Sequence, residues 1–433
     1  MIKKLEVDGY RLLDGFEADL GELTVVIGAN GAGKSTLIDC LQFISQAAQH
    51  PINDVILWHG GLISMLTARE RRDKVACRAS FDRSEKPGLW ASLPIKPGLE
   101  LVYEVELRKD LLWRAVPAYE ALRYAEAFPG HTLPFKFLES RDGRHRIYDV
   151  DQKQLIEPSL FPEHGPEDDV REGLASFDLE SVGRDQAAEA ERTLLLLAQQ
   201  RFFGRYPVPF WSRLVLASFA FYPGFKISPD APARRPSQIS PNPVLHPGGD
   251  NLSAILHNVF TRHAFREAAD EVRDFLRSAY PWVEEVTAEP SYAGPGSVSV
   301  RVQESGVQRQ MELADLSDGM LRFLCLEAAL LNPALPTLIA IDEPELGLHP
   351  RLLPIVADII KTGAERTQVL VTTHSPDLLQ CFDLDQIAVM TREETCAGWY
   401  RPSTRESLRK MLQAIEGDTL ADLHRSGELE AMP

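Results

Sequence analysis

The spacing of hydrophobic positions divides the chain into alternating, helical and continuously apolar stretches. Residues 1–20 alternate on either side of the Asp8-Gly9 turn, which predicts two short strands, and residues 75–81 and 99–107 alternate in the same way. The second half predicts helices over 252–275, 321–331 and 352–360 and strands over 297–303, 336–341, 368–373 and 387–390. Because strands and helices alternate, we expect an α/β fold built on a parallel sheet.

The pattern is less regular between residues 109 and 235, where prolines and turn signals are frequent. Within this region only residues 187–203 predict a helix, and no catalytic pattern stands out. We therefore predict three parts: an N-terminal lobe at 1–108, an inserted lobe of mixed or helical structure at 109–235, and a C-terminal lobe at 236–433.

A glycine-rich segment follows the apolar run 23–27. Its sequence, Gly28-Ala29-Asn30-Gly31-Ala32-Gly33-Lys34-Ser35, has the form G-x-x-x-x-G-K-[ST], and a helical pattern follows it. A strand, a glycine loop and a helix in this order predict a phosphate-binding site. Lys34 would reach the β- and γ-phosphates and Ser35 would bind Mg²⁺. The expected nucleotide-binding residues of the loop are Asn30, Gly31, Ala32, Gly33, Lys34, Ser35 and Thr36.

Two further groups of polar residues follow predicted strands. Asp342 and Glu343 end the run 336–341, and His374 follows the run 368–373. Since ligands bind at the carboxyl edge of open α/β sheets, these side chains should lie together there. We expect Asp342 to hold Mg²⁺ opposite Ser35, Glu343 to polarise the attacking water, and His374 to contact the γ-phosphate.

The segment Leu316-Ser317-Asp318-Gly319 precedes a predicted helix, and alone it indicates only a good N-cap. The order of the four motifs, however, resembles the ABC-type ATPases. Asn30 and Asp318 resemble the RecF/SMC/Rad50 branch more than transporter ATPases. Three runs are similar to the bacterial predicted ATPases with an AAA_21-type domain: 316–324, 341–350 and 371–376.

The resemblance implies an ABC-type ATPase head with an antiparallel β lobe, which binds ATP and Mg²⁺ and hydrolyses ATP with Lys34, Glu343 and His374. In this family two copies close head-to-tail, so Ser317, Asp318 and Gly319 of one copy would bind the nucleotide held by the other. Residues 345–349 correspond to the D-loop. The Q-loop glutamine of the family has no counterpart at the expected place, where Trp58-His59-Gly60-Gly61 stands instead.

Composition limits the partners. The formal net charge of −17 argues against nonspecific coating of nucleic acid, so DNA contact would need a local basic patch or a partner. Five scattered cysteines indicate a reducing compartment. With neither a signal peptide nor an apolar membrane span in view, we expect a cytoplasmic protein.

The resemblance favours a role in DNA maintenance or anti-phage defence. Only 59 residues follow His374, so we expect any nuclease or toxin effector to be a separate polypeptide. Two alternatives stay open: the ATP-binding subunit of a membrane transporter, and a regulatory scaffold with slow ATPase whose 109–235 lobe docks a partner.

Overall fold

The computed structural model describes most of the chain up to residue 404, together with residues 422, 424 and 425. The residues before 405 that it leaves out are 68–72, 87, 110–114, 142–143, 151, 157–194, 196, 201–203, 226 and 241–243. Most of the helix predicted at 187–203 lies outside the described residues.

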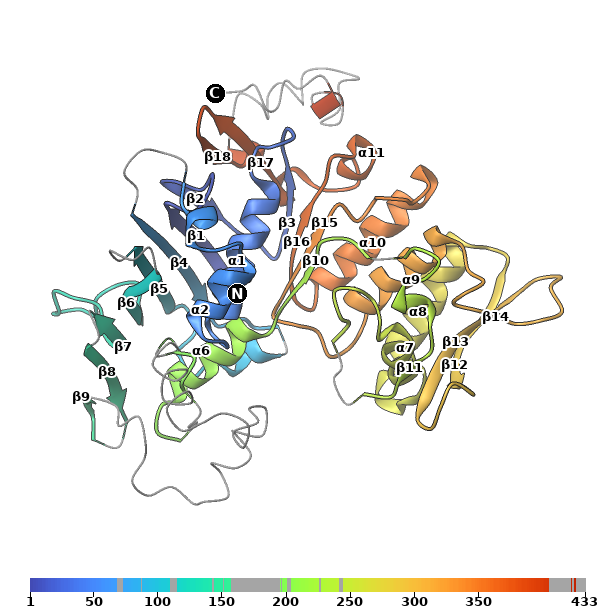
Figure 1. Cartoon of the computed structure of the whole chain (residues 1–433), viewed down its shortest axis with the longest axis horizontal. Coiled ribbons are helices and arrows are strands. Elements are labelled where there is room, and N and C mark those ends of the chain that lie inside the picture. The colour runs from blue at the N-terminus through green and yellow to red at the C-terminus, as the bar shows by residue number, and fades with distance from the viewer. Residues whose placement is uncertain are drawn as a thin grey trace. The chain divides into compact units, whose positions relative to one another are not determined.

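The chain forms two compact units (Figure 1). The first contains Met1–Leu20, Thr36–Ser218 and Arg392–Gly398. The second contains Gly21–Ser35, Phe219–Thr391 and Trp399–Pro433. The three-part division at residues 108 and 235 remains a prediction.

The first unit is built on an eight-stranded sheet whose paired strands are antiparallel. In spatial order the strands are β2 (Phe16–Asp19), β1 (Ile2–Asp8), β4 (Lys74–Asp82), β5 (Glu100–Lys109), β6 (Ala115–Tyr124), β7 (Lys136–Arg141), β8 (Arg144–Asp149) and β9 (Gln154–Ile156). The helices of this unit include α2 (Ile52–Trp58), α3 (Leu62–Met65) and α6 (Pro207–Ala217). The four strands predicted from alternation in the first 107 residues are β1, β2, β4 and β5.

The second unit is built on a six-stranded sheet. Its order is β10 (Phe219–Tyr222), β15 (Leu338–Asp342), β16 (Gln368–Thr372), β3 (Leu23–Ile27), β17 (Ile387–Glu393) and β18 (Cys396–Tyr400). The strands from β10 to β17 are parallel. All five residues of β3 and of β16 are buried, as expected of central parallel strands. Helix α1 (Lys34–Ala47) begins where the loop after β3 ends.

Helices and a small second sheet complete this unit (Figure 1). The helices are α7 (Leu252–Thr261), α8 (Arg266–Ala279), α9 (Asp318–Leu330), α10 (Leu353–Ala364) and α11 (Pro376–Leu379). The small sheet contains β11 (Ser237–Gln238), β12 (Val283–Pro290), β13 (Ser297–Glu304) and β14 (Met311–Glu312). In the part of the chain that is described, no helix has the length and apolar composition needed to cross a membrane.

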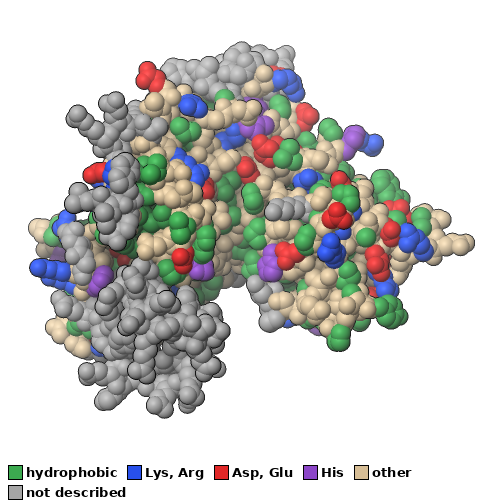
Figure 2. Space-filling model, in the orientation of Figure 1, with side chains coloured by type: hydrophobic (Ala, Val, Ile, Leu, Met, Phe, Trp, Pro, Cys, Tyr) green, Lys and Arg blue, Asp and Glu red, His purple; other side chains and the backbone are tan. Residues whose placement is uncertain are grey.

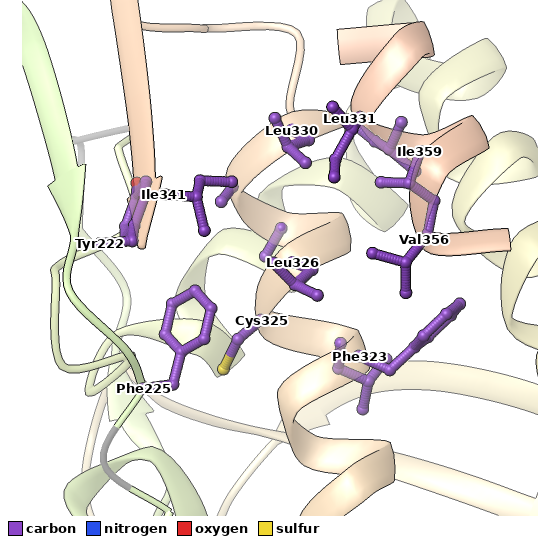
Figure 3. Close-up of a cluster of buried hydrophobic side chains, with 14 of the residues drawn as sticks. Tyr222, Phe225, Phe323, Cys325, Leu326, Leu330, Leu331, Ile341, Val356 and Ile359 are labelled. Atoms are coloured by element: carbon purple, nitrogen blue, oxygen red, sulfur yellow. The ribbon is translucent and has the colours of Figure 1, made fainter. Parts of the chain in front are cut away.

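Helix α9 lies at the centre of the hydrophobic core of the second unit. Figure 3 shows it between Tyr222 and Ile341 on one side and Val356 and Ile359 of α10 on the other. Ten of its thirteen residues are buried, including Leu326. Each fully buried large side chain contributes about 2 kcal/mol to folding. The core therefore fixes α9, and with it the segment that enters this helix.

One predicted element is wrong in its extent. The segment expected to be one helix over 252–275 is two helices, because Arg262 has extended backbone angles (φ −85°, ψ 121°). The Thr261 hydroxyl donates to the His257 carbonyl at 2.6 Å at the end of α7. Residues 261–264 are exposed, so no core contact holds the helix straight at this point. Continuous periodicity without Gly or Pro gave no sign of the break.

Candidate nucleotide-binding site

The loop between β3 and α1 needs its glycines for steric reasons. A Cβ at Gly28 would collide with the carbonyl oxygen of Met390. Gly31 and Gly33 have φ of 78° and 109°, which residues with a side chain rarely adopt. The three glycines therefore allow a tight loop directly against β17, at the N-terminus of a fourteen-residue helix. Such a loop is a ready anion site because backbone N–H groups and the helix dipole point toward it.

Lys34 is held within this loop. Its ammonium donates to the carbonyl oxygens of Gly28 at 2.6 Å and Ala29 at 3.2 Å, and the residue is 6% exposed. Because the aliphatic part of the Lys34 side chain is buried, its ammonium group stays at the loop instead of extending into solvent. A cation fixed in this way is suited to neutralise a phosphate bound by the loop.

Ser35 and Asp342 meet at the ends of their elements, as predicted. The Ser35 hydroxyl lies 3.3 Å from Asp342 Oδ2, and the Thr372 hydroxyl donates to Asp342 Oδ1. Hydroxyl and carboxylate oxygens are hard ligands that fit Mg²⁺. Among the described residues no group of three or more His, Cys, Asp or Glu side chains forms a metal site. A cation here would thus complete its shell with water and phosphate oxygens, as Mg²⁺ commonly does.

Glu343 and His374 lie side by side at the same edge of the sheet. His374 Nε2 is 3.6 Å from Glu343 Oε1, and both side chains are about one-third exposed, at 34% and 31%. Glu343 has φ of 50°, an unusual value for a residue with a side chain, which is typical of functional sites. Burial, and then the charge of Lys34, lower the pKa of His374 below its ordinary value of 6.5, although Glu343 opposes the shift. The lowered pKa favours the neutral imidazole of His374.

Glu345 is a site residue that sequence reasoning missed. Its Oε1 accepts hydrogen bonds from the Thr373 hydroxyl at 2.6 Å and from the His374 amide at 3.1 Å. Burial raises the pKa of Glu345. The carboxyl group therefore fastens the predicted D-loop to the backbone that carries His374. The sequence signals for Glu345 are its position two residues after Glu343 and its place at the start of the segment that resembles the D-loop.

The Ser317 segment begins helix α9. The Ser317 hydroxyl accepts a hydrogen bond from the Met320 amide at 3.3 Å, so it is the N-cap. Ser317 and Asp318 are both exposed. A hydroxyl that accepts this bond still has its own proton to donate, so Ser317 can cap the helix and contact a phosphate together.

Trp58-His59-Gly60-Gly61, which stands near the expected Q-loop, contributes its histidine to a buried network in the first unit. His59 Nε2 lies 3.0 Å from Gln46 Oε1, and His59 Nδ1 lies 2.9 Å from Asp39 Oδ1. The Tyr10 hydroxyl also donates a hydrogen bond to the Asp39 carboxylate. Arg11 forms an ion pair with the same carboxylate, with Nη1 3.0 Å from Asp39 Oδ2. Burial opposes ionisation of Asp39, but the hydrogen bonds from His59 and Tyr10 outweigh it and lower its pKa. These hydrogen bonds attach α1 to the rest of the first unit. They occupy the side chains of both Gln46 and His59.

Two parts of the chain match ATPase family profiles. Residues 209–380 match the family profile AAA_21, described as "AAA domain, putative AbiEii toxin, Type IV TA system". Residues 1–86 match AAA_15, "AAA ATPase domain". No curated protein sequence matches the chain.

Solved structures of SMC heads resemble the whole fold. An SMC head bound to the C-terminal winged-helix domain of ScpA has a TM-score of 0.51 at 11% identity, over 92% of this chain and 97% of that one. A Pyrococcus furiosus SMC head with an extended coiled coil, bound to the C-terminal domain of ScpA, has a TM-score of 0.48 at 15% identity, over 95% and 99%. The first likeness supports the fold.

The parallel sheet, with its glycine loop between β3 and α1, has the arrangement of a P-loop fold. Together with the two family matches and the first SMC-head likeness, it supports the fold of an ABC/SMC-like P-loop ATPase with an antiparallel β lobe. The predicted fold class is thereby confirmed.

Proposed function

We propose that the chain binds and hydrolyses MgATP at a site that two copies complete head-to-tail. One observation carries this proposal: the ends of three adjacent parallel strands, β15, β16 and β3, bring together Lys34, the Ser35–Asp342 pair and the Glu343–His374 pair. This is one half of a phosphoryl-transfer site. The exposed Ser317 at the start of α9 supplies the other half from the second copy.

Each residue has a distinct task in this proposal. Lys34 binds the β- and γ-phosphates, while Ser35 and Asp342 hold Mg²⁺, which neutralises phosphate charge when bound. Glu343 accepts a hydrogen bond from the attacking water and orients it. Neutral His374 lies beside Glu343 without adding a positive charge that would pair with the carboxylate. Ser317 donates its proton to the γ-phosphate of the opposite copy.

ATP binding then acts as a switch. Only the γ-phosphate contacts residues of both copies, so ATP closes the dimer and hydrolysis opens it. The expected residues of the loop, Asn30 to Thr36, bind the α- and β-phosphates through backbone N–H groups.

The switch most simply serves DNA maintenance or anti-phage defence with a separate nuclease or toxin as effector. The AAA_21 description, which names a type IV toxin–antitoxin system, supports this proposal. Asn30 and Asp318 favour it over a transporter subunit. A slow regulatory ATPase that docks a partner through residues 109–235 is the second alternative.

Double-stranded DNA should raise the ATPase rate several-fold if DNA is the partner, because contact with both copies favours the closed state. Figure 2 shows basic and acidic side chains interspersed over the described residues of the face in view, so DNA contact on this face would be local. Phosphate release is measured with increasing DNA length, with single-stranded RNA as the control. Equal rates with and without DNA would assign the switch to a protein partner instead.

A further inference from the structure

A buried arginine supports the Ser317 segment from a distant part of the chain. Arg234 ends a 3₁₀ turn at Pro232–Arg234, and its side chain is 7% exposed. Its guanidinium donates to the carbonyl oxygens of Ile227 at 3.1 Å, Leu313 at 3.2 Å and Leu316 at 2.8 Å. A fourth bond goes to the carboxylate of Asp318. Arginine is suited to this place because its planar fork binds several acceptors at fixed angles.

These acceptors enclose Ser317. Leu316 precedes it and Asp318 follows it, so Arg234 holds the chain on both sides of the residue proposed to contact the γ-phosphate. The Met320 amide holds the Ser317 hydroxyl itself. Arg234 thus fixes the backbone and leaves the Ser317 proton available.

Arg234 also compensates an unfavourable charge. Asp318 is the first residue of α9, and its side chain is 67% exposed. In the proposed dimer a carboxylate next to Ser317 would face a triphosphate and repel it. Pairing with a buried guanidinium offsets this charge, and this is the physical reason why Asp318 can stand in this segment.

The loop at residues 246–251, which leads into α7, packs against the turn that carries Arg234. Gly249 has φ of 73°, and a Cβ there would lie 3.1 Å from Cys325 Sγ on α9 and 3.3 Å from Ala233 Cβ. Asn251 fixes the loop by donating to the Val244 carbonyl at 2.9 Å. The glycine therefore lets this loop hold the turn close to α9.

We propose that Arg234 is the positioning residue of the Ser317 segment: it orders this segment and neutralises Asp318, so that a second copy can bind the γ-phosphate. This inference rests on the proposed two-copy site. It predicts that loss of Arg234 weakens closure of the dimer without weakening nucleotide binding to one copy.

The test uses the Glu343→Gln chain, in which bound ATP should be consumed only slowly. Arg234→Met in this background should weaken ATP-dependent dimerisation about tenfold or more, since hydrogen bonds with a charged donor are lost. Arg235→Met is the matched control, because Arg235 is the adjacent arginine and its side chain, among the described residues, donates an exposed hydrogen bond to the Asp230 carbonyl. Dimer affinity is measured by light scattering over a range of protein concentrations, and ADP affinity of the single copy by calorimetry.

Two further variants separate positioning from loss of folding. Arg234→Lys keeps the charge, but its single ammonium lacks the planar fork that reaches three carbonyl oxygens and the Asp318 carboxylate together, so it should weaken the dimer by a smaller factor with unchanged ADP affinity. Adding Asp318→Asn to Arg234→Met should restore part of the affinity, because the unpaired carboxylate is gone. Dimer affinities of Arg234→Met and Arg234→Lys equal to that of Arg235→Met would overturn the inference. If the Glu343→Gln chain itself never dimerises, the two-copy site fails instead.

Discussion

Glu343→Gln is expected to lower the turnover of ATP by roughly 100- to 1,000-fold while ATP still binds. The amide has the shape of the carboxylate and keeps the reach to His374 across 3.6 Å. It cannot accept the proton of water or orient water through a negative charge. Because Lys34, Ser35 and Asp342 are unchanged, the variant should hold MgATP and stay closed.

Phosphate release and ATP affinity are measured together for this variant. Glu394→Gln is the control, since Glu394 also has a positive φ, of 47°, but lies outside the predicted site. It should leave the rate unchanged, which separates the chemistry of Glu343 from its backbone strain. Undiminished turnover by Glu343→Gln would remove Glu343 from its proposed role.

Lys34→Ala is expected to weaken ATP binding by about 100-fold or more, because a charge-assisted contact to two phosphates is lost. The loop would also lose the two hydrogen bonds that the Lys34 ammonium donates to the carbonyl oxygens of Gly28 and Ala29. Lys3→Ala is the control: this residue is 47% exposed and pairs only at the surface with Asp82. Calorimetric titration with MgATP measures both affinities, and wild-type affinity of Lys34→Ala would contradict the phosphate-loop assignment.

The parts of the site that the sequence predicted are those set by local pattern. An apolar run followed by a polar residue identifies the end of a buried strand. Adjacent parallel strands then bring those ends together, which is why Ser35 and Asp342 lie 3.3 Å apart although 307 residues separate them. The nearness of Glu343 and His374 follows in the same way.

The parts that the sequence did not predict depend on contacts without a local pattern. Arg234 is 84 residues from Asp318, and the stretch around it, rich in prolines and turn signals, shows no catalytic pattern. Glu345 and the Tyr10–Asp39–His59 network likewise need the folded chain to bring their polar atoms together. The break at Arg262 could not be predicted, because the sequence alone does not show which faces of the two helices pack against the core.

The central claim, that two copies share each site, is tested most directly by mixing two inactive variants. Lys34→Ala removes the ammonium of the phosphate loop but keeps the Ser317 segment intact. Ser317→Glu keeps the phosphate loop but disables the Ser317 segment, because it places a negative charge against the γ-phosphate. In a mixture, random pairing gives half mixed dimers with one intact site each, so phosphate release should return to about one quarter of the wild-type rate. A mixture that stays as inactive as its separate components would show that each site is formed within a single copy.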